Sequence, residues 1–465
     1  MSYQLPQHID NNKVFIVNRS EIEGRLDPKM ALYNRKVQNW SYPKVRLKDL
    51  LLSKPQYGAA EPGINRTDIK SPRYIRITDI DEYGLISHND LGATANTIED
   101  QYILHDYDLL IARSGATVGK AYIHKGCPYT CFFAGYLIRF VINPLKAMPD
   151  YVFAFTQTNT YKEWVNAIQR PSGQPNINAE EYQSLEIPLP PQPNQNEIVS
   201  IIQTAYSKKQ RKEFEAQQLL DGIDKYLLDE LGVSLPEVRN ELKDRVFLLN
   251  RSELEGRFDP TVYKDGIKLI SSKWDNEKLS KVAFVNPGGA YKGKTADTPI
   301  SFVPMEVIDE TFSEITTMGE TTIEQASGFT KFREGDLLWA KITPCMQNGK
   351  SAIAKNLTNG LGCGSTEFFV MRSKDEQLAI EYLHVILHMK CVRETAMLYF
   401  GGSAGQQRVS SAFLENFNLP LPPKGKQIEI VNHVCAMRQR AKVLQEEGKA
   451  ILEEAKRNVE SMIIG

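Results

Sequence analysis

The sequence lacks long apolar runs, an excess of charge of either sign and any cluster of cysteines or histidines. Each absence argues against a class of protein or a kind of site. No stretch of about 18 apolar residues occurs, so no membrane-spanning helix is predicted. The first residues, MSYQLPQHIDNNKVF, do not place a basic region before an apolar one, and we therefore expect a cytoplasmic protein. With 56 basic and 57 acidic residues, the whole chain carries no electrostatic signature of a nucleic-acid binder.

Metal-binding motifs are also missing. Cys127 and Cys131 are the only close pair among the six cysteines, and no second pair or group of histidines completes a zinc site around them. We interpret them as reduced, partly buried thiols. His384 and His388 stand four residues apart but lack the glutamate of a His-Glu-x-x-His motif, which indicates surface or packing roles.

Motifs of catalysis are equally hard to find. The segment 115–120 is one residue short of a phosphate-binding loop, and 344–351 has proline where that loop needs its first glycine. The sequence contains no Gly-x-Ser-x-Gly elbow and no Asp/Asn-Pro-Pro-aromatic loop of an amino-methyltransferase. These absences favour a binding protein, and an enzyme with an unrecognised site is the alternative.

What the sequence does contain is an internal repeat with an offset of 232 residues. FIVNRSEIEGRLDP at 15–28 and FLLNRSELEGRFDP at 247–260 are identical at ten of fourteen positions. IPLPPQPNQNEIV at 187–199 and LPLPPKGKQIEIV at 419–431 share eight of thirteen residues. The residues between these anchors diverge strongly, so each copy is a variable body between similar edges. With 465 residues, the chain is also too long for one ordinary core.

Each variable body is predicted to be a mixed α+β domain. Short apolar runs rich in β-branched and aromatic residues are separated by Gly, Pro and Asp, which is typical of strands. The predicted strands are 73–78, 109–112, 136–141, 337–340 and 367–371. Helical stretches are expected to follow from near Pro149 and near Gln377.

A long helix is predicted after each proline-rich segment. Apolar residues recur with a period near 3.5, from Ile198 to Tyr226 in the first copy and from Ile430 to Met462 in the second. Each helix should run about 36 to 38 residues, or roughly 55 Å. We expect the two helices to pack as an antiparallel coiled coil, with packing on the helix's own body or on another protein as the alternative.

The paired Pro-Leu-Pro-Pro-x3-Gln-x-Glu-Ile-Val segments, which include Gln195 and Gln427, open these helices. Together with Asp108–Lys120 and Ser172–Asn178, they resemble the specificity subunit of type I restriction-modification systems. The likeness extends over nearly the whole chain. The Asn-Arg-Ser-Glu-x-Glu-Gly-Arg-x-Asp-Pro motif that opens both copies is shared by only some members, so what it contacts stays open.

The resemblance implies an α+β protein with two tandem target recognition domains, separated by the two helices and related by a pseudo-twofold axis. The expected parts are a first recognition domain at 1–190, a central helix at 191–232, a second recognition domain at 233–422 and a C-terminal helix at 423–465. Each recognition domain would read one half of a bipartite target on double-stranded DNA. Because the two bodies differ, we expect an asymmetric target.

The resemblance also implies partners. The helices would set the gap between the half-sites and dock two methyltransferase subunits, and restriction/translocase subunits would join the complex. S-adenosylmethionine, ATP and Mg are expected in those partners, and no cofactor, metal or catalytic residue is expected in this chain.

Candidate DNA contacts are polar residues on predicted loops, because Arg and Lys pair with guanine, Asn and Gln pair with adenine, and several types grip phosphate. For each of them, a solvated surface position or a structural turn is the alternative. The candidates are Arg113, Ser114, Lys120, Arg170, Gln174, Asn176, Lys341, Thr343, Lys350, Gln406, Gln407 and Arg408.

Two other functions fit the same features. The scaffold could serve a related system that cleaves near its site or only methylates, or it could bind protein alone through its long helices. The base sequence that is read does not follow from side chains whose placement is unknown.

Overall fold

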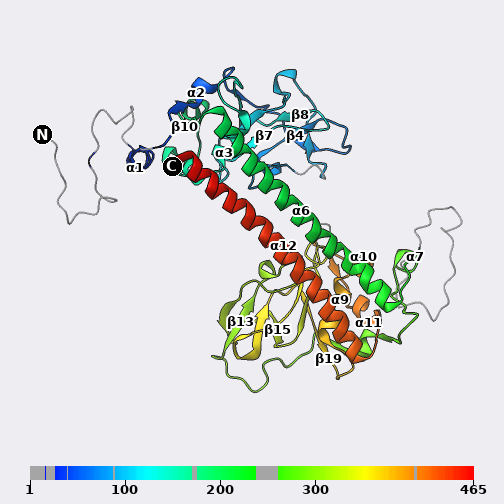
Figure 1. Cartoon of the computed structure of the whole chain (residues 1–465). Coiled ribbons are helices and arrows are strands. Elements are labelled where there is room, and N and C mark those ends of the chain that lie inside the picture. Colours follow the sequence, from blue (N-terminus) through cyan, green and yellow to red (C-terminus); the bar gives the residue numbers. More distant parts are fainter. Residues whose placement is uncertain are drawn as a thin grey trace. The chain divides into compact units, whose positions relative to one another are not determined.

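The computed structural model describes residues 16, 27–38, 40–86, 90–169, 175–236, 260–402 and 406–464. The chain divides into two compact units. The first comprises the described residues up to Arg211 together with those from Glu447 onward, and the second comprises Lys212–Glu446. Both units combine helices with sheets (Figure 1), which confirms the prediction of repeated mixed domains with a long helix between them.

The core of the first unit is a four-stranded antiparallel sheet in the order β2-β9-β6-β7. Its strands are β2 (Gln56–Tyr57), β9 (Leu137–Val141), β6 (Asp108–Ala112) and β7 (Ala121–Ile123). Along β6, Leu109 and Ile111 face the helices, whereas Leu110 and Ala112 face a second sheet. All five residues of β6 are therefore buried.

Helices cover the first face of this sheet, and the smaller sheet covers the other. The helices are α3 (Pro149–Thr156), α4 (Asn159–Ile168) and α5 (Ala179–Gln183). The smaller sheet has the order β3-β5-β4-β8, with bounds β3 (Ile64–Asn65), β5 (Ala93–Thr94), β4 (Arg73–Ile75) and β8 (Cys131–Phe133). Strands β4 and β8 run parallel, and a 3₁₀ turn, η2 (Ile77–Asp79), follows β4.

The second unit repeats this plan. Its antiparallel sheet has the order β12-β19-β16-β17, with bounds β12 (Ala283–Val285), β19 (Phe368–Ser373), β16 (Leu337–Ala340) and β17 (Ser351–Ile353). Its smaller sheet has the order β14-β13-β18-β15, with bounds β14 (Gly319–Thr322), β13 (Pro299–Val303), β18 (Leu361–Gly364) and β15 (Thr330–Arg333). The helices α9 (Ile380–His388), α10 (Lys390–Met397) and α11 (Ser411–Asn416) belong to this unit, as does the short pair β20 (Phe400–Gly401) and β21 (Arg408–Val409).

A two-stranded edge leads into each long helix. In the first unit β1 (Lys44–Arg46) pairs antiparallel with β10 (Glu186–Pro188), and in the second β11 (Asn276–Lys278) pairs with β22 (Asn418–Pro420). The registers match residue for residue at the 232-residue offset of the sequence repeat. Short helices follow β1 and β11, namely α2 (Leu47–Leu50) and α8 (Leu279–Val282).

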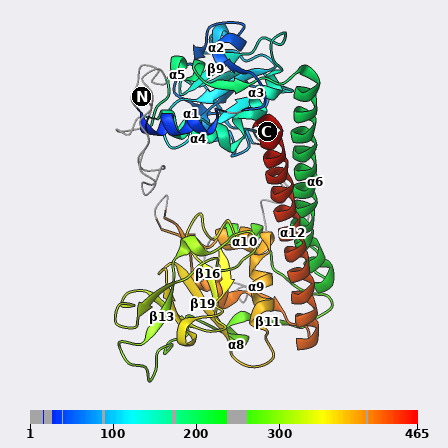
Figure 2. The same cartoon turned by 60° about the vertical axis from the view of Figure 1, so that its left-hand side comes forward.

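Each long helix contributes one half to each unit. The helices are α6 (Gln192–Leu231) and α12 (Lys424–Ile464), of 40 and 41 residues. In the first unit Ile198 shares a core with Val459, and the C-terminal end of α12 lies near α3 (Figure 2). In the second unit Ile223 shares a core with Val434.

The two helices run antiparallel within each unit. In the second unit, Lys426 forms an ion pair of 2.8 Å with Glu230, and further along both helices the ring of Tyr226 stacks on His433 at 4.1 Å. Residue numbers therefore fall along α6 as they rise along α12. The expected antiparallel helix pair is confirmed.

The repeated motif at the start of each copy lies mostly outside the described residues. Its last two residues in the first copy, Asp27 and Pro28, start α1 (Pro28–Lys36). Asp27 caps this helix by accepting a hydrogen bond from the Lys29 N–H, and proline suits the first helical position because it needs no N–H partner there. In the second copy Pro260 opens α7 (Pro260–Asp265).

The predicted strands are found within a residue or two, apart from 73–78. There the chain leaves the sheet after Ile75 and forms η2, in which the Asp79 carboxylate accepts hydrogen bonds from the Arg76 backbone and guanidinium.

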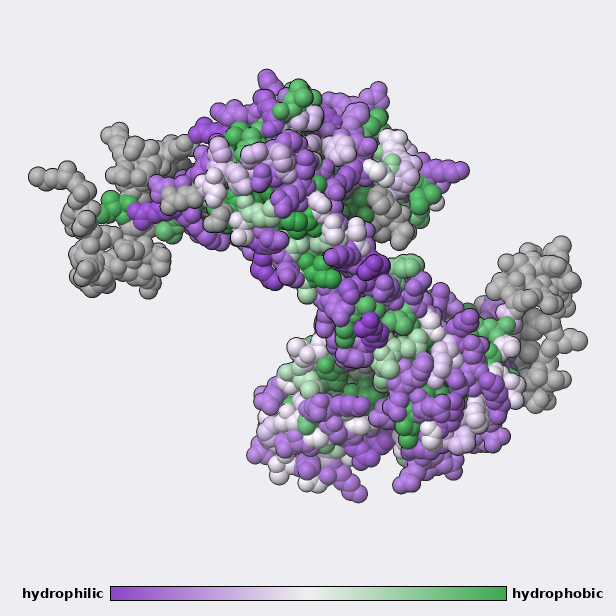
Figure 3. Space-filling model, in the orientation of Figure 1, coloured by the Kyte–Doolittle hydropathy of each residue, from purple (hydrophilic) through white to green (hydrophobic). Residues whose placement is uncertain are grey.

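Hydrophilic residues dominate the visible face of each unit (Figure 3). No helix among the described residues is long and apolar enough to cross a membrane.

Candidate nucleic-acid interface

The end of strand β6 brings together candidates that are far apart in the sequence. Ser114 forms an antiparallel β-bridge with Asn176. On either side of it, the Ile177 N–H donates to the Arg113 carbonyl at 2.8 Å, and the Gly115 N–H donates to the Pro175 carbonyl at 3.0 Å. The structure therefore places Arg113, Ser114 and Asn176 on two adjoining segments, which we call the first reading edge.

Two tyrosines that the sequence reasoning missed complete the first reading edge. The Arg113 guanidinium lies over the ring of Tyr57 at 4.9 Å, and the Arg113 N–H donates to the Tyr136 carbonyl at 3.0 Å. Tyr57 and Tyr136 are 39% and 63% exposed, so both rings present apolar surface to solvent. Among the described residues, no acceptor contacts the buried Nε of Arg113.

Two glycines allow these tyrosines to lie on neighbouring segments. A Cβ atom at Gly58 would stand 2.4 Å from the Ala134 carbonyl oxygen, so only glycine permits this approach. The Gly135 N–H then donates to the Ala59 carbonyl at 2.7 Å. A tyrosine next to a glycine at the end of a strand is the sequence signal that could have identified these residues.

The second unit has an equivalent edge after strand β16. Ile342 forms an antiparallel bridge with Arg408. The Thr343 N–H donates to the Gln407 carbonyl at 3.0 Å, and the Val409 N–H donates to the Lys341 carbonyl at 2.8 Å. The candidates Lys341, Thr343, Gln407 and Arg408 form the second reading edge, and the exposed Gln406 adjoins it.

The two edges differ in charge pairing. Arg408 donates to both carboxylate oxygens of Glu367 at 2.8 Å, and these hydrogen bonds lower the pKa of Glu367 below its ordinary value. Lys341 lies over the Phe369 ring at 5.5 Å. The arginine of the first edge faces an aromatic ring, whereas the arginine of the second edge faces a carboxylate.

Lys120 and Lys350 have matching contacts away from the reading edges. The Lys350 ammonium donates to the Met305 carbonyl at 3.2 Å, in the 3₁₀ turn η6 (Met305–Val307). The Lys120 ammonium donates to the carbonyl of Ile80, the residue after η2. Both lysines thus hold the 3₁₀ turn that follows the strand in the parallel pair of the smaller sheet, β4 in the first unit and β13 in the second, and their DNA contact stays a prediction. Arg170 and Gln174 lie outside the described residues.

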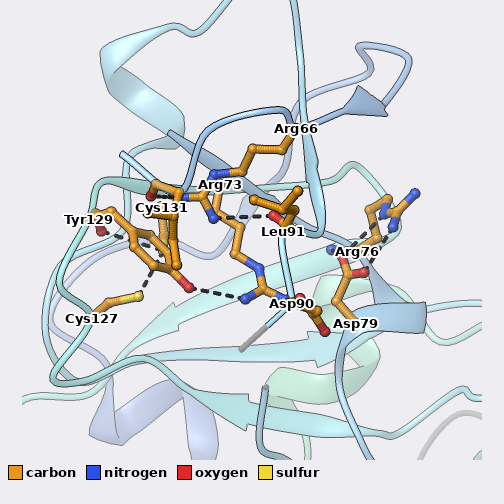
Figure 4. Close-up of polar contacts among 10 residues, drawn as sticks. Arg66, Arg73, Arg76, Asp79, Asp90, Leu91, Cys127, Tyr129 and Cys131 are labelled. Carbon is orange, nitrogen blue, oxygen red and sulfur yellow. Dashed lines mark hydrogen bonds and ion pairs between the residues drawn. The ribbon is translucent and has the colours of Figure 1, made fainter. Parts of the chain in front are cut away.

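A group of arginines on the smaller sheet of the first unit was also missed (Figure 4). Arg73 donates to the Tyr129 hydroxyl at 3.0 Å and to the Asp90 carboxylate at 2.7 Å. The Arg66 guanidinium lies over the Tyr129 ring at 4.1 Å. Arg66 and Arg73 are buried, so they organise the loop around Tyr129 and do not present their charge at the surface.

Arg76 belongs to the same group but is 43% exposed. It forms an ion pair with Asp79 at 2.9 Å. Of the three guanidinium groups, it is the one that can reach an external phosphate. No group of three or more potential metal ligands occurs among the described residues.

Comparison with known proteins gives a consistent result. The family model described as the type I restriction modification DNA specificity domain matches residues 73–218 and 271–440. The specificity subunit of the type I restriction enzyme EcoEI from Escherichia coli is 34% identical over 232 residues, which are 48% of this chain and 36% of that protein. The corresponding subunit of EcoAI, also from Escherichia coli, is 30% identical over 194 residues, 41% of this chain and 32% of that protein.

The chain thus matches about a third of the length of each of these relatives. A solved chain from work on complex assembly and conformational transition of the type I R-M system covers 91% of this chain and 96% of its own length. Its TM-score is 0.51 at 15% identity, so the two chains share a fold.

Proposed function

The chain belongs to the family of type I restriction-modification DNA specificity domains, and from that premise we propose that it reads the target sequence on double-stranded DNA for such a system. Each unit reads one half of a bipartite target. The family match falls separately on the two copies, which suits two reading modules in one chain.

The observation that carries this proposal is the pair of reading edges. Both have the same backbone frame, a bridge between the end of the central strand and a distant segment. Their side chains differ, with Arg113, Ser114 and Asn176 on the first and with Lys341, Thr343, Gln407 and Arg408 on the second. A shared frame with different donors and acceptors suits an asymmetric target.

The chemistry of these edges suits base recognition. Arginine and lysine can donate two hydrogen bonds to guanine, and Asn176 and Gln407 can each donate and accept with adenine. The exposed rings of Tyr57 and Tyr136 add apolar surface for contact with thymine methyl groups or sugars. Arg76 supplies a phosphate contact in the first unit, which would fix orientation more than sequence.

The partners follow from the same proposal. Two methyltransferase subunits dock on the long helices, and restriction/translocase subunits complete the enzyme. S-adenosylmethionine, ATP and Mg act in those subunits, and this chain recognises DNA without catalysing a reaction. Near-neutral net charge fits this arrangement, because the partners would then supply most of the phosphate contacts.

An exchange of domains tests the proposal. Residues 40–190 are replaced by the corresponding domain of another family member, and methylated adenines are mapped in DNA modified by the assembled complex. We expect one half of the target to change and the other half to stay. The reciprocal exchange of 233–422 should change only the other half.

Retention of the original target by both exchanged complexes would exclude DNA reading and favour a scaffold that binds only protein. A related system that only methylates is separated by a second measurement. The complex is incubated with unmodified target DNA, ATP and Mg, with and without the restriction subunit, and cleavage is scored.

A further inference from the structure

Two cysteines in the first unit lie close enough to react with each other. They flank the loop Cys127-Pro128-Tyr129-Thr130-Cys131, and their sulfur atoms are 3.2 Å apart (Figure 4). Cys131 is the first residue of β8 and is buried, whereas Cys127 is only partly buried. A small movement would bring the sulfurs to the bonding distance of about 2.05 Å.

The fold holds the C-terminal end of this loop. The Arg73 N–H donates to the Thr130 carbonyl at 2.8 Å, and the Leu104 N–H donates to the Cys131 carbonyl at 2.8 Å. Strand β8 is therefore fixed by neighbours on both sides. The Tyr129 side chain is held by hydrogen bonding to Arg73 and by stacking under Arg66. The sheet thus fixes Cys131, and the adjoining loop brings the Cys127 sulfur within 3.2 Å of it.

The surroundings of the thiols also separate their reactivities. The pKa of Cys127 is lowered to about 7, first by the hydrogen bond with Cys131 and further by the Tyr129 backbone and the charge of Arg73. The same hydrogen bond and burial raise the pKa of Cys131. The more accessible sulfur is therefore the one that loses its proton more readily to form the thiolate, which is the nucleophilic form.

We propose that Cys127 and Cys131 form a reversible dithiol–disulfide site, in which Cys127 attacks a low-molecular-weight disulfide and Cys131 resolves the product. This inference goes beyond DNA recognition and does not depend on it.

The reaction consists of two balanced exchanges. The Cys127 thiolate attacks one sulfur of the disulfide RSSR, forms a mixed disulfide with it and releases one RS⁻. Cys131 then loses its proton and attacks the Cys127 sulfur, which forms the protein disulfide and releases a second RS⁻. The two cysteines lose two protons and two electrons in total, and RSSR is reduced to two thiols.

The second unit has no such pair at the matching position. In the first unit Arg73 pairs with Cys131 across the parallel strands β4 and β8, and in the second unit Ser301 pairs with Gly362 across the equivalent strands β13 and β18. Gly362 therefore stands at the position of Cys131. The site is therefore a property of the first unit alone.

Thiol mapping after treatment with oxidised glutathione tests the proposal on the full chain. We expect the wild-type protein to lose two alkylatable thiols, and the peptide that contains residues 127 and 131 to become lighter by two hydrogens. The C131S variant should trap glutathione on Cys127, because the resolving thiol is gone. The C127S variant should keep Cys131 as a thiol.

The exposed Cys435 provides the control, since C435S should still lose the two thiols of the pair. The oxidised wild-type protein should also unfold at a higher temperature than the reduced protein, reversibly with dithiothreitol, because a crosslink restricts the unfolded chain. Retention of both thiols in the wild-type protein would overturn the proposal. So would a glutathione adduct on Cys127 that persists while Cys131 is present.

Discussion

The two units share one arrangement of sheets and helices but differ in the side-chain contacts that stabilise it. In both, a buried aspartate at the start of the central strand pairs with an arginine on the neighbouring strand. The pairs are Asp108 with Arg139 at 3.3 Å and Asp336 with Arg372 at 2.6 Å. The second pair has two short hydrogen bonds, whereas the first has one longer bond. The aspartate and the arginine thus occupy the same positions in both units, but the number and length of the hydrogen bonds between them differ.

The units also differ in their smaller sheets and helical cores. In the first unit the extra strand β3 pairs with β5, whereas in the second β15 pairs with β18. Tyr151 and Tyr382 occupy equivalent positions, because each hydroxyl donates to the carbonyl of the proline that ends the edge strand of its unit. Two residues further along the chain, Phe153 of the first unit therefore corresponds to His384 of the second. The common frame therefore tolerates local changes on either face of the central sheet.

The buried ion pairs should give the largest difference between the units. Asp336→Asn leaves the Arg372 guanidinium without its counter-charge, and we expect a loss of about 3 kcal/mol in unfolding free energy. Asp108→Asn should cost less, because Arg139 also donates to the Ile103 carbonyl at 2.8 Å. Urea unfolding measures both, with hydrogen exchange to identify the affected unit.

Asp100→Asn is the control for these variants, since Asp100 is exposed and should tolerate the change. Equal losses from Asp108→Asn and Asp336→Asn would show that bond number and length do not distinguish the two pairs.

Replacement of the glutamine at the start of either long helix should destabilise the two units to a similar extent. Each buried side chain accepts a hydrogen bond from a backbone N–H at the start of a helix and donates one to a proline carbonyl. The partners are Met148 and Pro190 for Gln195, and Ala379 and Pro422 for Gln427. Replacement by leucine leaves these backbone groups unsatisfied and should cost about 2 kcal/mol in either unit.

Thermal unfolding of both leucine variants checks this expectation, beside Gln210→Leu, a change at an exposed position of α6. A loss confined to one unit's glutamine would mean that the repeated motif is structural in only one copy.

Acid should weaken the second unit through His384. Burial, followed by the charge of Arg438, lowers the pKa of His384 to about 3, so this histidine is neutral in the folded protein. In the unfolded chain it takes up a proton below about pH 6.5. The folded state therefore loses about 1.4 kcal/mol per pH unit below that value, while stability above it is unaffected.

His384→Phe, which places the residue of the first unit in the second, should reduce this acid dependence, and His388, whose pKa is also lowered by burial, should account for part of the remainder. Unfolding at a series of pH values from 7 to 5 measures the slope. The phenylalanine variant also loses the contact of His384 with the Ser351 hydroxyl at 3.1 Å, so its stability at pH 7 is the reference for its own curve. An unchanged slope would assign the acid sensitivity to other groups.

The reading edges should give the smallest effects on stability and a selective effect on recognition. Arg408→Ala and Arg113→Ala change partly exposed side chains, so both proteins should fold normally. Each should weaken discrimination at one position of one half-site by roughly tenfold, the first variant in one half and the second in the other. Methylation rates on targets with single base changes measure this.

Lys281→Ala serves as the comparison, because this lysine is exposed, pairs with Glu277 and lies outside both reading edges. A loss of discrimination in both halves from either arginine variant would contradict the assignment of one edge to each half-site.

Much of the frame could be predicted from the sequence because it depends on local pattern and on repetition. The period of apolar residues predicts both long helices, and the repeat around Gln195 and Gln427 marks their starts. The predicted strand 337–340 coincides with β16 because four apolar residues suit a strand that is buried on both faces. The pseudo-twofold arrangement and the domain boundaries stay predictions.

The sequence by itself determined that the chain is one module written twice, with similar edges and divergent bodies. Only the tertiary structure decided which distant residues meet, such as Ser114 with Asn176 and the segments that carry Tyr57 and Tyr136. The reason is physical, because local propensity acts within a few residues. The pairing of remote segments depends instead on how two sheets and their helices bury a common core.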